Sequence, residues 1–137
     1  MSEKNKTTVL KVLIERVHSL KNGSKLNEAI RTAQTAVDTA RRLIQINPDQ
    51  TLNLITSLEL FGDLLRESEN YAEAESIYLE ALEQTKSVNS DNEQLARIKS
   101  SLASVYDFNQ CPELAIALYQ EAIELFTALV PPSELDV

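Results

Sequence analysis

Residues that interrupt helices are scarce in this chain of 137 residues. It has two glycines, four prolines and no tryptophan, and aromatic side chains make up only 5% of it. A β-sandwich or a β-barrel needs frequent turns, and glycine and proline are the usual turn residues. Their scarcity, together with abundant Ala, Leu and Glu, favours long helices joined by short connections. We therefore predict an all-α fold.

Residues for catalysis or metal binding are equally few. Cys111 is the only cysteine and His18 the only histidine, so no internal disulfide and no cluster of His and Cys ligands can form. The two lie far apart in sequence, and no glycine-rich loop could hold a phosphate. We expect His18 to be a partly exposed helix residue and Cys111 a small residue in a turn. We predict no enzyme, no cofactor and no metal.

Long apolar runs are also missing. No stretch approaches the about twenty apolar residues that a membrane-spanning helix needs, and the N-terminus resembles no signal peptide. The net charge of -8 opposes binding to nucleic acid and to anionic lipid, and the one basic stretch, "KVLIERVHSLKNGSK", contains no aromatic side chain. We expect a cytoplasmic protein, with the nucleus as the alternative, that binds neither nucleic acid nor a membrane.

Apolar residues spaced by three and four positions predict six helices. Their expected ranges are about 7–20, 26–46, 51–68, 71–88, 92–108 and 112–130. After the first helix, Gly23 suits the left-handed conformation that ends helices. Asp49 or Thr51 is expected to cap the third helix, and Ser90 with Glu93 has the spacing of a capping box before the fifth.

Two predicted helices have closely similar sequences. "YAEAESIYLEALE" begins at Tyr71 and "PELAIALYQEAIE" at Pro112, which is a period of forty-one residues. The shared small and aromatic positions are Ala74, Tyr78 and Ala81 in the first copy and Ala115, Tyr119 and Ala122 in the second. A further step back of the same length places Ala33 and Ala40 on Ala74 and Ala81.

The period pairs the six helices into three antiparallel hairpins. We expect one domain over residues 1–130, with units at about 7–46, 51–88 and 92–130, and a tail over 131–137. Each hairpin leaves apolar surface that a neighbouring hairpin must cover, so stacking is the expected source of stability.

The spacing within the second and third units resembles the tetratricopeptide repeat (TPR) family. The matching positions are Leu58, Phe61, Gly62, Leu65, Ala74, Tyr78 and Ala81 in one unit, and Leu102, Ala103, Tyr106, Ala115, Tyr119 and Ala122 in the other. The long period is similar to the kinesin-light-chain class. The first unit departs, because Lys21 and Ser24 fall where small and aromatic residues belong. The resemblance implies a short right-handed solenoid that serves as a non-catalytic protein-binding adaptor or scaffold.

In that family the first helices of the units line a concave groove. The resemblance implies a groove lined by Thr56, Glu59, Asp63, Arg66, Glu67, Arg97, Ser100, Ser104, Asp107 and Phe108. This lining is mainly acidic, so we expect a basic or amphipathic peptide or helix as the ligand. Chaperone-binding members grip a carboxylate with Lys and Asn, where this chain has Glu59 and Asp63. We expect no such clamp in these units.

The last helix has more apolar residues than one interface requires. We expect Leu114, Ala115, Leu118, Tyr119, Ala122 and Leu129 to cover the fifth helix. A second strip then remains, made of Ile116, Ile123, Phe126 and Val130. Terminal repeats normally present a polar outer face, so this strip predicts association with another protein or a second copy. The alternative function is a purely structural subunit of a larger assembly or homo-oligomer.

Overall fold

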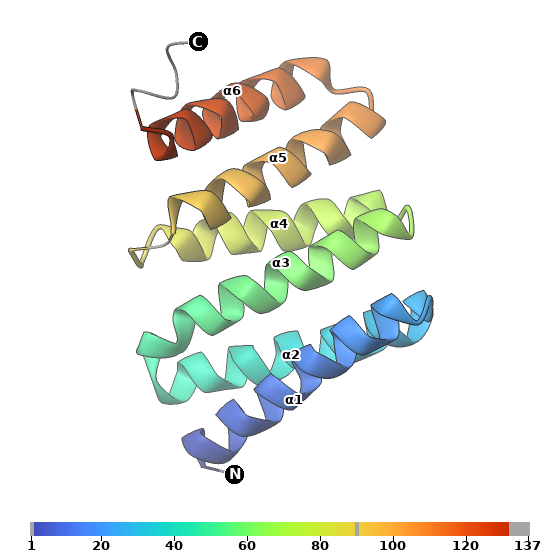
Figure 1. Ribbon diagram of the computed structural model, residues 1–137, viewed down its shortest axis with the longest axis vertical. Coiled ribbons are helices and arrows are strands. Elements are labelled where there is room, and N and C mark those ends of the chain that lie inside the picture. Colours follow the sequence, from blue (N-terminus) through green and yellow to red (C-terminus); the bar gives the residue numbers. More distant parts are fainter. Residues whose placement is uncertain (1, 90, 132–137) are drawn as a thin grey trace.

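A computed structural model describes residues 2–89 and 91–131. Within these ranges the chain forms six α-helices, one short 3-10 helix and no strand, which confirms the prediction of an all-α fold. The elements are α1 (Glu3–Asn22), α2 (Leu26–Ile46), η1 (Pro48–Gln50), α3 (Thr51–Glu67), α4 (Tyr71–Thr85), α5 (Asn92–Phe108) and α6 (Pro112–Leu129). They form three hairpins stacked along the long axis of the molecule, with α1 at one end and α6 at the other (Figure 1).

The first helices of the hairpins share one face of the stack, which we call the first-helix face. Lys21 of α1 lies 3.2 Å from Glu67 of α3, and Arg97 of α5 donates to Glu59 of α3 over 3.0 Å. The second helices are linked separately, because Arg41 of α2 pairs with Glu80 of α4 at 2.6 Å. α2 also packs against α3, and α4 against α5, so each of these second helices contacts the first helix of the next hairpin.

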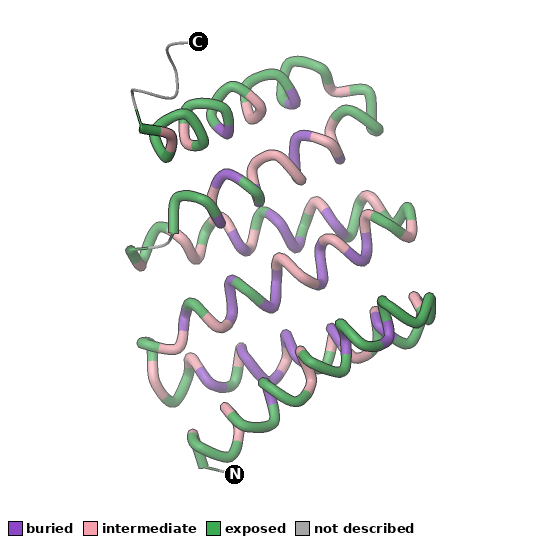
Figure 2. The backbone as a smooth tube through the Cα atoms, in the orientation of Figure 1, coloured by how far each residue is buried: buried purple, intermediate pink, exposed green. Residues whose placement is uncertain are grey.

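Small residues allow the helices of the second hairpin to cross closely. Gly62 of α3 faces Tyr78 of α4, and a Cβ added at Gly62 would lie 2.7 Å from Cε1 of the tyrosine ring. Tyr78 and its neighbours Ala74 and Ala81 are fully buried. Figure 2 shows the buried residues concentrated where the hairpins meet, with α1 and α6 mostly exposed.

The three hairpin turns have the same backbone geometry, and it differs from our expectation at Gly23. The left-handed residues are Ser24, Glu69 and Gln110, with φ between 60° and 66°, whereas Gly23 has φ -85°. In each turn the next amide closes a six-residue loop; Lys25 N–H, for example, donates to the carbonyl of Leu20 over 2.9 Å. This hydrogen bond requires the left-handed residue to be Ser24, one position after the glycine, so the prediction for Gly23 is wrong.

The turns also correct the register of the first hairpin. Ser24, Glu69 and Gln110 are equivalent, so the first two units are forty-five residues apart and the last two are forty-one apart. Consequently Ala29 and Ala36, not Ala33 and Ala40, correspond to Ala74 and Ala81. The difference of four arises because α2 is six residues longer than α4, while the connection after α2 is two residues shorter than the one after α4.

Several helix ends differ from the sequence-based expectation. α1 begins at Glu3, four residues early, because Ser2 Oγ accepts the N–H of Asn5. α4 ends at Thr85 rather than Val88.

The expected caps of α3 and α5 are also different. Neither Asp49 nor Thr51 caps α3, since η1 intervenes and its own cap is Asn47. Asp91 caps α5 by accepting the N–H of Glu93 over 2.9 Å, and the expected cap, Ser90, lies outside the described residues.

Candidate functional site

The ten residues expected to line a groove lie on α3 and α5, which contribute to the first-helix face. The corrected register adds a third set of positions, from α1. They are Lys11, Ile14, His18, Lys21 and Asn22, the counterparts of Thr56, Glu59, Asp63, Arg66 and Glu67. Sequence reasoning missed them because it applied a constant period of forty-one. The signal that could have found them is the spacing of Val17, Leu20 and Ala29, which repeats that of Gly62, Leu65 and Ala74.

A hollow of about 240 Å³ separates α1 from α3 on this face. Its lining combines apolar, basic and acidic side chains: Ile14, His18, Lys21, Thr56, Glu59, Leu60 and Asp63. Mixed linings of this kind suit a peptide side chain, with an apolar body against the leucine and isoleucine and a polar end among the charges.

Between α3 and α5 two pairs of expected groove residues contact each other, Glu59 with Arg97 and Arg66 with Ser104. Arg97 donates to both carboxylate oxygens of Glu59, over 3.0 and 3.4 Å. The amide of Gln94, which is buried, donates to Glu59 and to Thr56 over 3.3 and 3.2 Å. These four residues therefore fasten the second hairpin to the third, in addition to forming the face.

A second network surrounds the tyrosine that packs on Gly62. Tyr78 donates its hydroxyl hydrogen to Asp63, and Arg66 donates to the same hydroxyl oxygen over 3.3 Å. Another nitrogen of Arg66 reaches the hydroxyl of Ser104 in α5, also over 3.3 Å. Arg66 thus bridges the second and third hairpins.

Burial raises the pKa of two groups in this network, Asp63 and Tyr78. Burial raises the pKa of the Asp63 carboxyl, although the hydrogen bond from Tyr78 opposes this shift. Burial also raises the pKa of the Tyr78 hydroxyl, and the neighbouring charge of Asp63 adds to the effect. The hydroxyl therefore stays protonated and remains a hydrogen-bond donor throughout the physiological range.

The remaining expected groove residues are Glu67, Asp107 and Phe108, which lie at the ends of their helices, and Ser100, which lies in the middle of α5. Glu67 pairs with Lys21, and Ser100 is half-buried on α5. Asp107 and Phe108 are exposed, and they border a hollow of about 430 Å³ that Ser104 and Tyr119 complete. The ring of Phe108 stacks on Tyr71, with centroids 4.8 Å apart.

Charge is segregated along the stack. Residues 1–46 carry nine Lys and Arg against four carboxylates, a net charge of +5. Residues 100–131 carry no Lys or Arg and four carboxylates, a net charge of -4. Along the first-helix face, α1 contributes Lys11 and Lys21, α3 contributes three carboxylates against Arg66, and α5 contributes Arg97 against Asp107. The face is therefore basic at α1, acidic at α3 and balanced at α5, rather than mainly acidic throughout.

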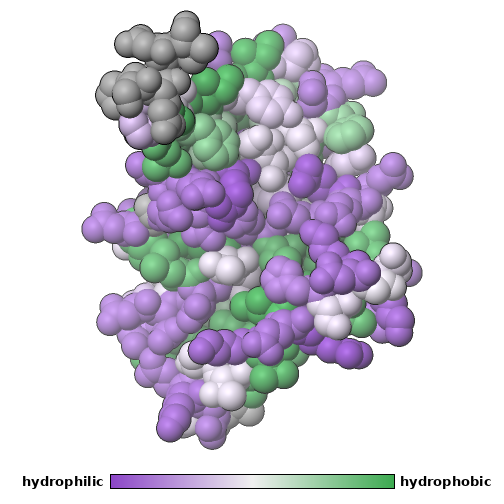
Figure 3. Space-filling view, viewed as in Figure 1, coloured by the Kyte–Doolittle hydropathy of each residue, from purple (hydrophilic) through white to green (hydrophobic). Residues whose placement is uncertain are grey.

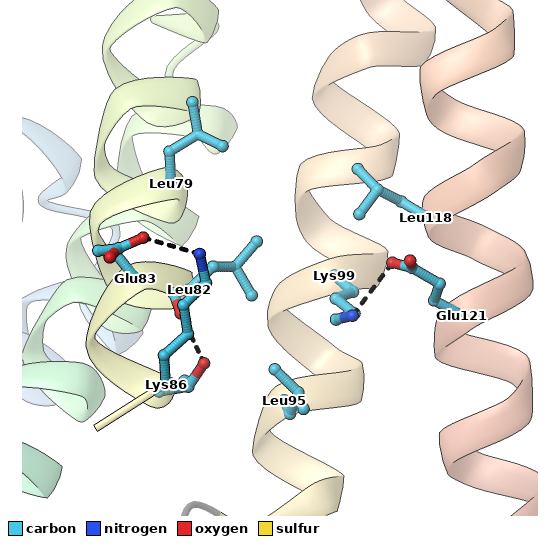
Figure 4. A pocket seen from close by; sticks show the side chains of 9 residues that line it. Leu79, Leu82, Glu83, Lys86, Leu95, Lys99, Leu118 and Glu121 are labelled. Atoms are coloured by element: carbon cyan, nitrogen blue, oxygen red, sulfur yellow. Dashed lines mark hydrogen bonds and ion pairs between the residues drawn. The ribbon is translucent and has the colours of Figure 1, made fainter. Parts of the chain in front are cut away.

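A separate cleft of about 500 Å³ lies between α4 and α6, over α5. Four leucines line it, Leu79, Leu82, Leu95 and Leu118 (Figure 4). Two ion pairs flank them, each at 3.0 Å: Glu83 of α4 with Lys86, which follows the helix, and Lys99 of α5 with Glu121 of α6. The sequence analysis did not predict this cleft, because its leucines come from three helices.

Apolar side chains reach the surface over α6 (Figure 3). Of the strip defined above, Ile116, Ile123 and Phe126 are exposed and Val130 is half-buried. Leu114 and Leu129 are exposed as well, so the expectation that they cover α5 is wrong. Leu114 lies about 100° around the helix from the buried Ala115. Leu129 continues the line of Ala115 and Ala122, but it is the last residue of α6.

The described part of the chain contains no group of three His, Cys, Asp or Glu residues that could hold a metal ion. His18 lies on α1 and Cys111 immediately before α6, two hairpins away. The thiol of Cys111 lies 3.6 Å from the carbonyl of Asn109 and caps no helix amide. Among residues 2–89 and 91–131, no helix has both the length and the apolar character to cross a membrane.

Three stacked hairpins with small residues at their crossings define a helical-repeat solenoid. The sequence profile described as Tetratricopeptide repeat matches residues 53–128, more than half of the chain, and the chain belongs to this family. TPR repeats are generally interaction modules, and TPR domains bind protein partners.

Among solved structures, the chain is similar to BtubC (BKLC) from P. vanneervenii, a kinesin-light-chain-like TPR protein, with a TM-score of 0.59 and 29% identity. The match covers 75% of this chain and 41% of BtubC, so the chain spans less than half the length of that protein. No curated protein matches the chain.

Proposed function

We propose that this TPR protein is a non-catalytic adaptor that binds a peptide or helix on its first-helix face. The observation that carries the proposal is the hollow between α1 and α3, where Ile14 and Leu60 lie beside His18, Lys21 and Asp63. The fixed network of Glu59, Arg97 and Gln94 holds the neighbouring helices in place, so a ligand meets a preorganised surface.

The charge distribution favours one orientation of the ligand. A basic or amphipathic segment suits the C-terminal end of α5, where Asp107 is exposed and no Lys or Arg follows residue 99. An apolar side chain of the same ligand would enter the hollow beside Ile14. The cytoplasm remains the expected compartment for such an adaptor.

The experiment compares two helical peptides by fluorescence anisotropy, an amphipathic Leu–Lys peptide and its Leu–Glu counterpart. We expect the Leu–Lys peptide to bind more tightly and Asp107→Lys to weaken its binding several-fold. Asp49→Lys, at an exposed position on η1, makes the same charge change away from the face and should have little effect. Equal binding of both peptides, or equal effects of both variants, would contradict the proposal.

A second candidate function is that of a structural subunit that associates through α6. The exposure of Ile116, Ile123 and Phe126 supports it, because terminal repeats usually present polar residues there. The two functions use different surfaces, so Asp107→Lys should impair only peptide binding, and Ile123→Glu only association.

A further inference from the structure

The exposed strip of α6 occupies positions that are buried elsewhere in the same molecule. Through the turn register, Ile123 and Phe126 of the strip correspond to Val37 and Ala40 of α2. The two residues of α2 are 0% exposed, whereas those of α6 are 62% and 38% exposed. α2 packs against α3 of the next hairpin, and no described element lies beyond α6. The strip therefore matches the surface with which a second helix packs against the next hairpin, but no described helix covers it.

The opposite end of the stack has the complementary half of this interface. Val9 and Val12 of α1 are 37% and 59% exposed, and their counterparts in α3, Leu54 and Ser57, are 1% and 0% exposed. α3 differs from α1 in having a hairpin on both sides. The valines thus stand where a first helix meets the second helix of a preceding hairpin.

The two ends also have opposite charge. α1 carries Lys4, Lys6, Lys11, Arg16 and Lys21 against Glu3 and Glu15, a net charge of +3. α6 carries Glu113, Glu121 and Glu124 and no cation, a net charge of -3. Arg16 is exposed at the position that Phe61 takes in α3, so it would point toward a helix packed on α1.

We propose that a second copy of this chain covers α6, with α1 of one copy lying on α6 of the next. In this joint, α1 takes the place that α3 takes on α2 and that α5 takes on α4. Val9 and Val12 would meet the apolar strip, and Arg16 would face the carboxylates of α6. The inference deepens the second candidate function by naming the partner and the surface that the partner uses.

The joint is heterologous, because each copy presents α6 to one neighbour and α1 to another. Head-to-tail contacts of this kind do not close into a dimer and continue as an open chain or ring. A symmetric contact between two α6 helices is less favourable, because it would bring Glu113, Glu121 and Glu124 of both copies together.

Sedimentation velocity over a range of protein concentrations tests the joint. The wild type should form oligomers larger than a dimer at low salt and fewer of them at high salt. Ile123→Glu removes one half of the joint and Val12→Glu the other, so each variant alone should be a monomer of 15.3 kDa. An equimolar mixture of the two variants should form a heterodimer of twice that mass, because each retains the half that the other lacks.

Leu52→Glu is the matched control, since Leu52 is exposed on α3 and belongs to neither end, and it should assemble like the wild type. Circular dichroism of each variant separates loss of folding from loss of assembly. A monomeric wild type at all concentrations, a mixture that forms no heterodimer, or a Val12→Glu protein that still dimerises overturns the joint. The last result would indicate a symmetric α6 contact. Peptide binding to the first-helix face is measured in a separate experiment, and none of these outcomes would contradict it.

Discussion

At the scale of single residues, the close contact between Gly62 and Tyr78 determines how tightly the second hairpin packs. A Cβ at position 62 would meet the tyrosine ring at 2.7 Å, so we expect Gly62→Ala to destabilise the protein by about 1–3 kcal/mol, as overpacked cores do. In a Tyr78→Leu background the clash disappears. The same Gly62→Ala change should then stabilise by up to about 1 kcal/mol, because alanine is the better helix former.

Urea unfolding of the four proteins measures both effects. A change of sign between the two backgrounds identifies the ring as the cause. If Gly62→Ala has the same effect in both backgrounds, the close contact does not determine stability.

Asp63 should make stability depend on pH in an unusual direction. Its pKa in the folded protein is raised above the usual 3.8, chiefly by burial, so the folded state holds this proton more tightly than the unfolded state. The contribution of Asp63 is therefore greatest below pH 3.8 and is lost as the pH rises through the folded pKa. Asp63→Asn keeps an acceptor for Tyr78 and removes this titration.

We expect the unfolding free energy of wild type, measured relative to Asp63→Asn, to fall between acid and neutral pH. Urea titrations at several pH values provide the comparison. Asp107→Asn serves as the control, because it removes one negative charge from an exposed position on the same face. A difference that stays constant, or rises with pH, would contradict the assignment.

At the scale of elements, each hairpin turn places a non-glycine residue in the left-handed region. Ser24→Gly should stabilise the first hairpin by about 0.5–1 kcal/mol, because glycine has no Cβ to strain the backbone there. Gly23→Ala should be tolerated, since φ is -85° and an added Cβ would lie 3.4 Å from the nearest backbone oxygen.

Thermal unfolding of both variants tests the turn geometry. If Gly23→Ala were strongly destabilising and Ser24→Gly had no benefit, the left-handed residue would be Gly23 and not Ser24.

The helices and their pairing could be predicted from the sequence, but the register of the first hairpin could not. Spacing by three and four residues predicted six helices and their pairing, because each helix buries one apolar side. The register of the first hairpin, which is shifted by four residues, was missed because the added length lies inside α2, where it continues the helical pattern without a break. The sizes of the two residues at the helix crossing also differ between the units: the first has Val17 and Ala33 where the second has Gly62 and Tyr78.

The candidate site was predictable only in part, for a physical reason. Spacing placed Glu59 and Arg97 on first helices, but their ion pair joins residues thirty-eight positions apart and depends on how the hairpins stack. In α6 almost every side is apolar, so the helical pattern alone could not decide that Leu114 and Leu129 would be exposed.

At the scale of the whole molecule, the hairpins should differ in local stability. The second hairpin is covered on both sides and contains the fully buried Phe61 and Tyr78, whereas the buried residues of α6 are only Ala115 and Ala122. We expect amide hydrogen exchange to be fastest in α6 and slowest in α3 and α4. Equal protection of α6 and α4 in dilute solution would mean that the outer face of α6 is covered.

The separation of charge along the stack has a consequence for motion in solution. With +5 over residues 1–46 and -4 over residues 100–131, the molecule carries a permanent electric dipole along its long axis. A charged neighbour exerts a torque on such a dipole before any surfaces touch, so encounters are oriented end-on. At physiological ionic strength that torque acts over about 8 Å, a distance of less than two helix turns.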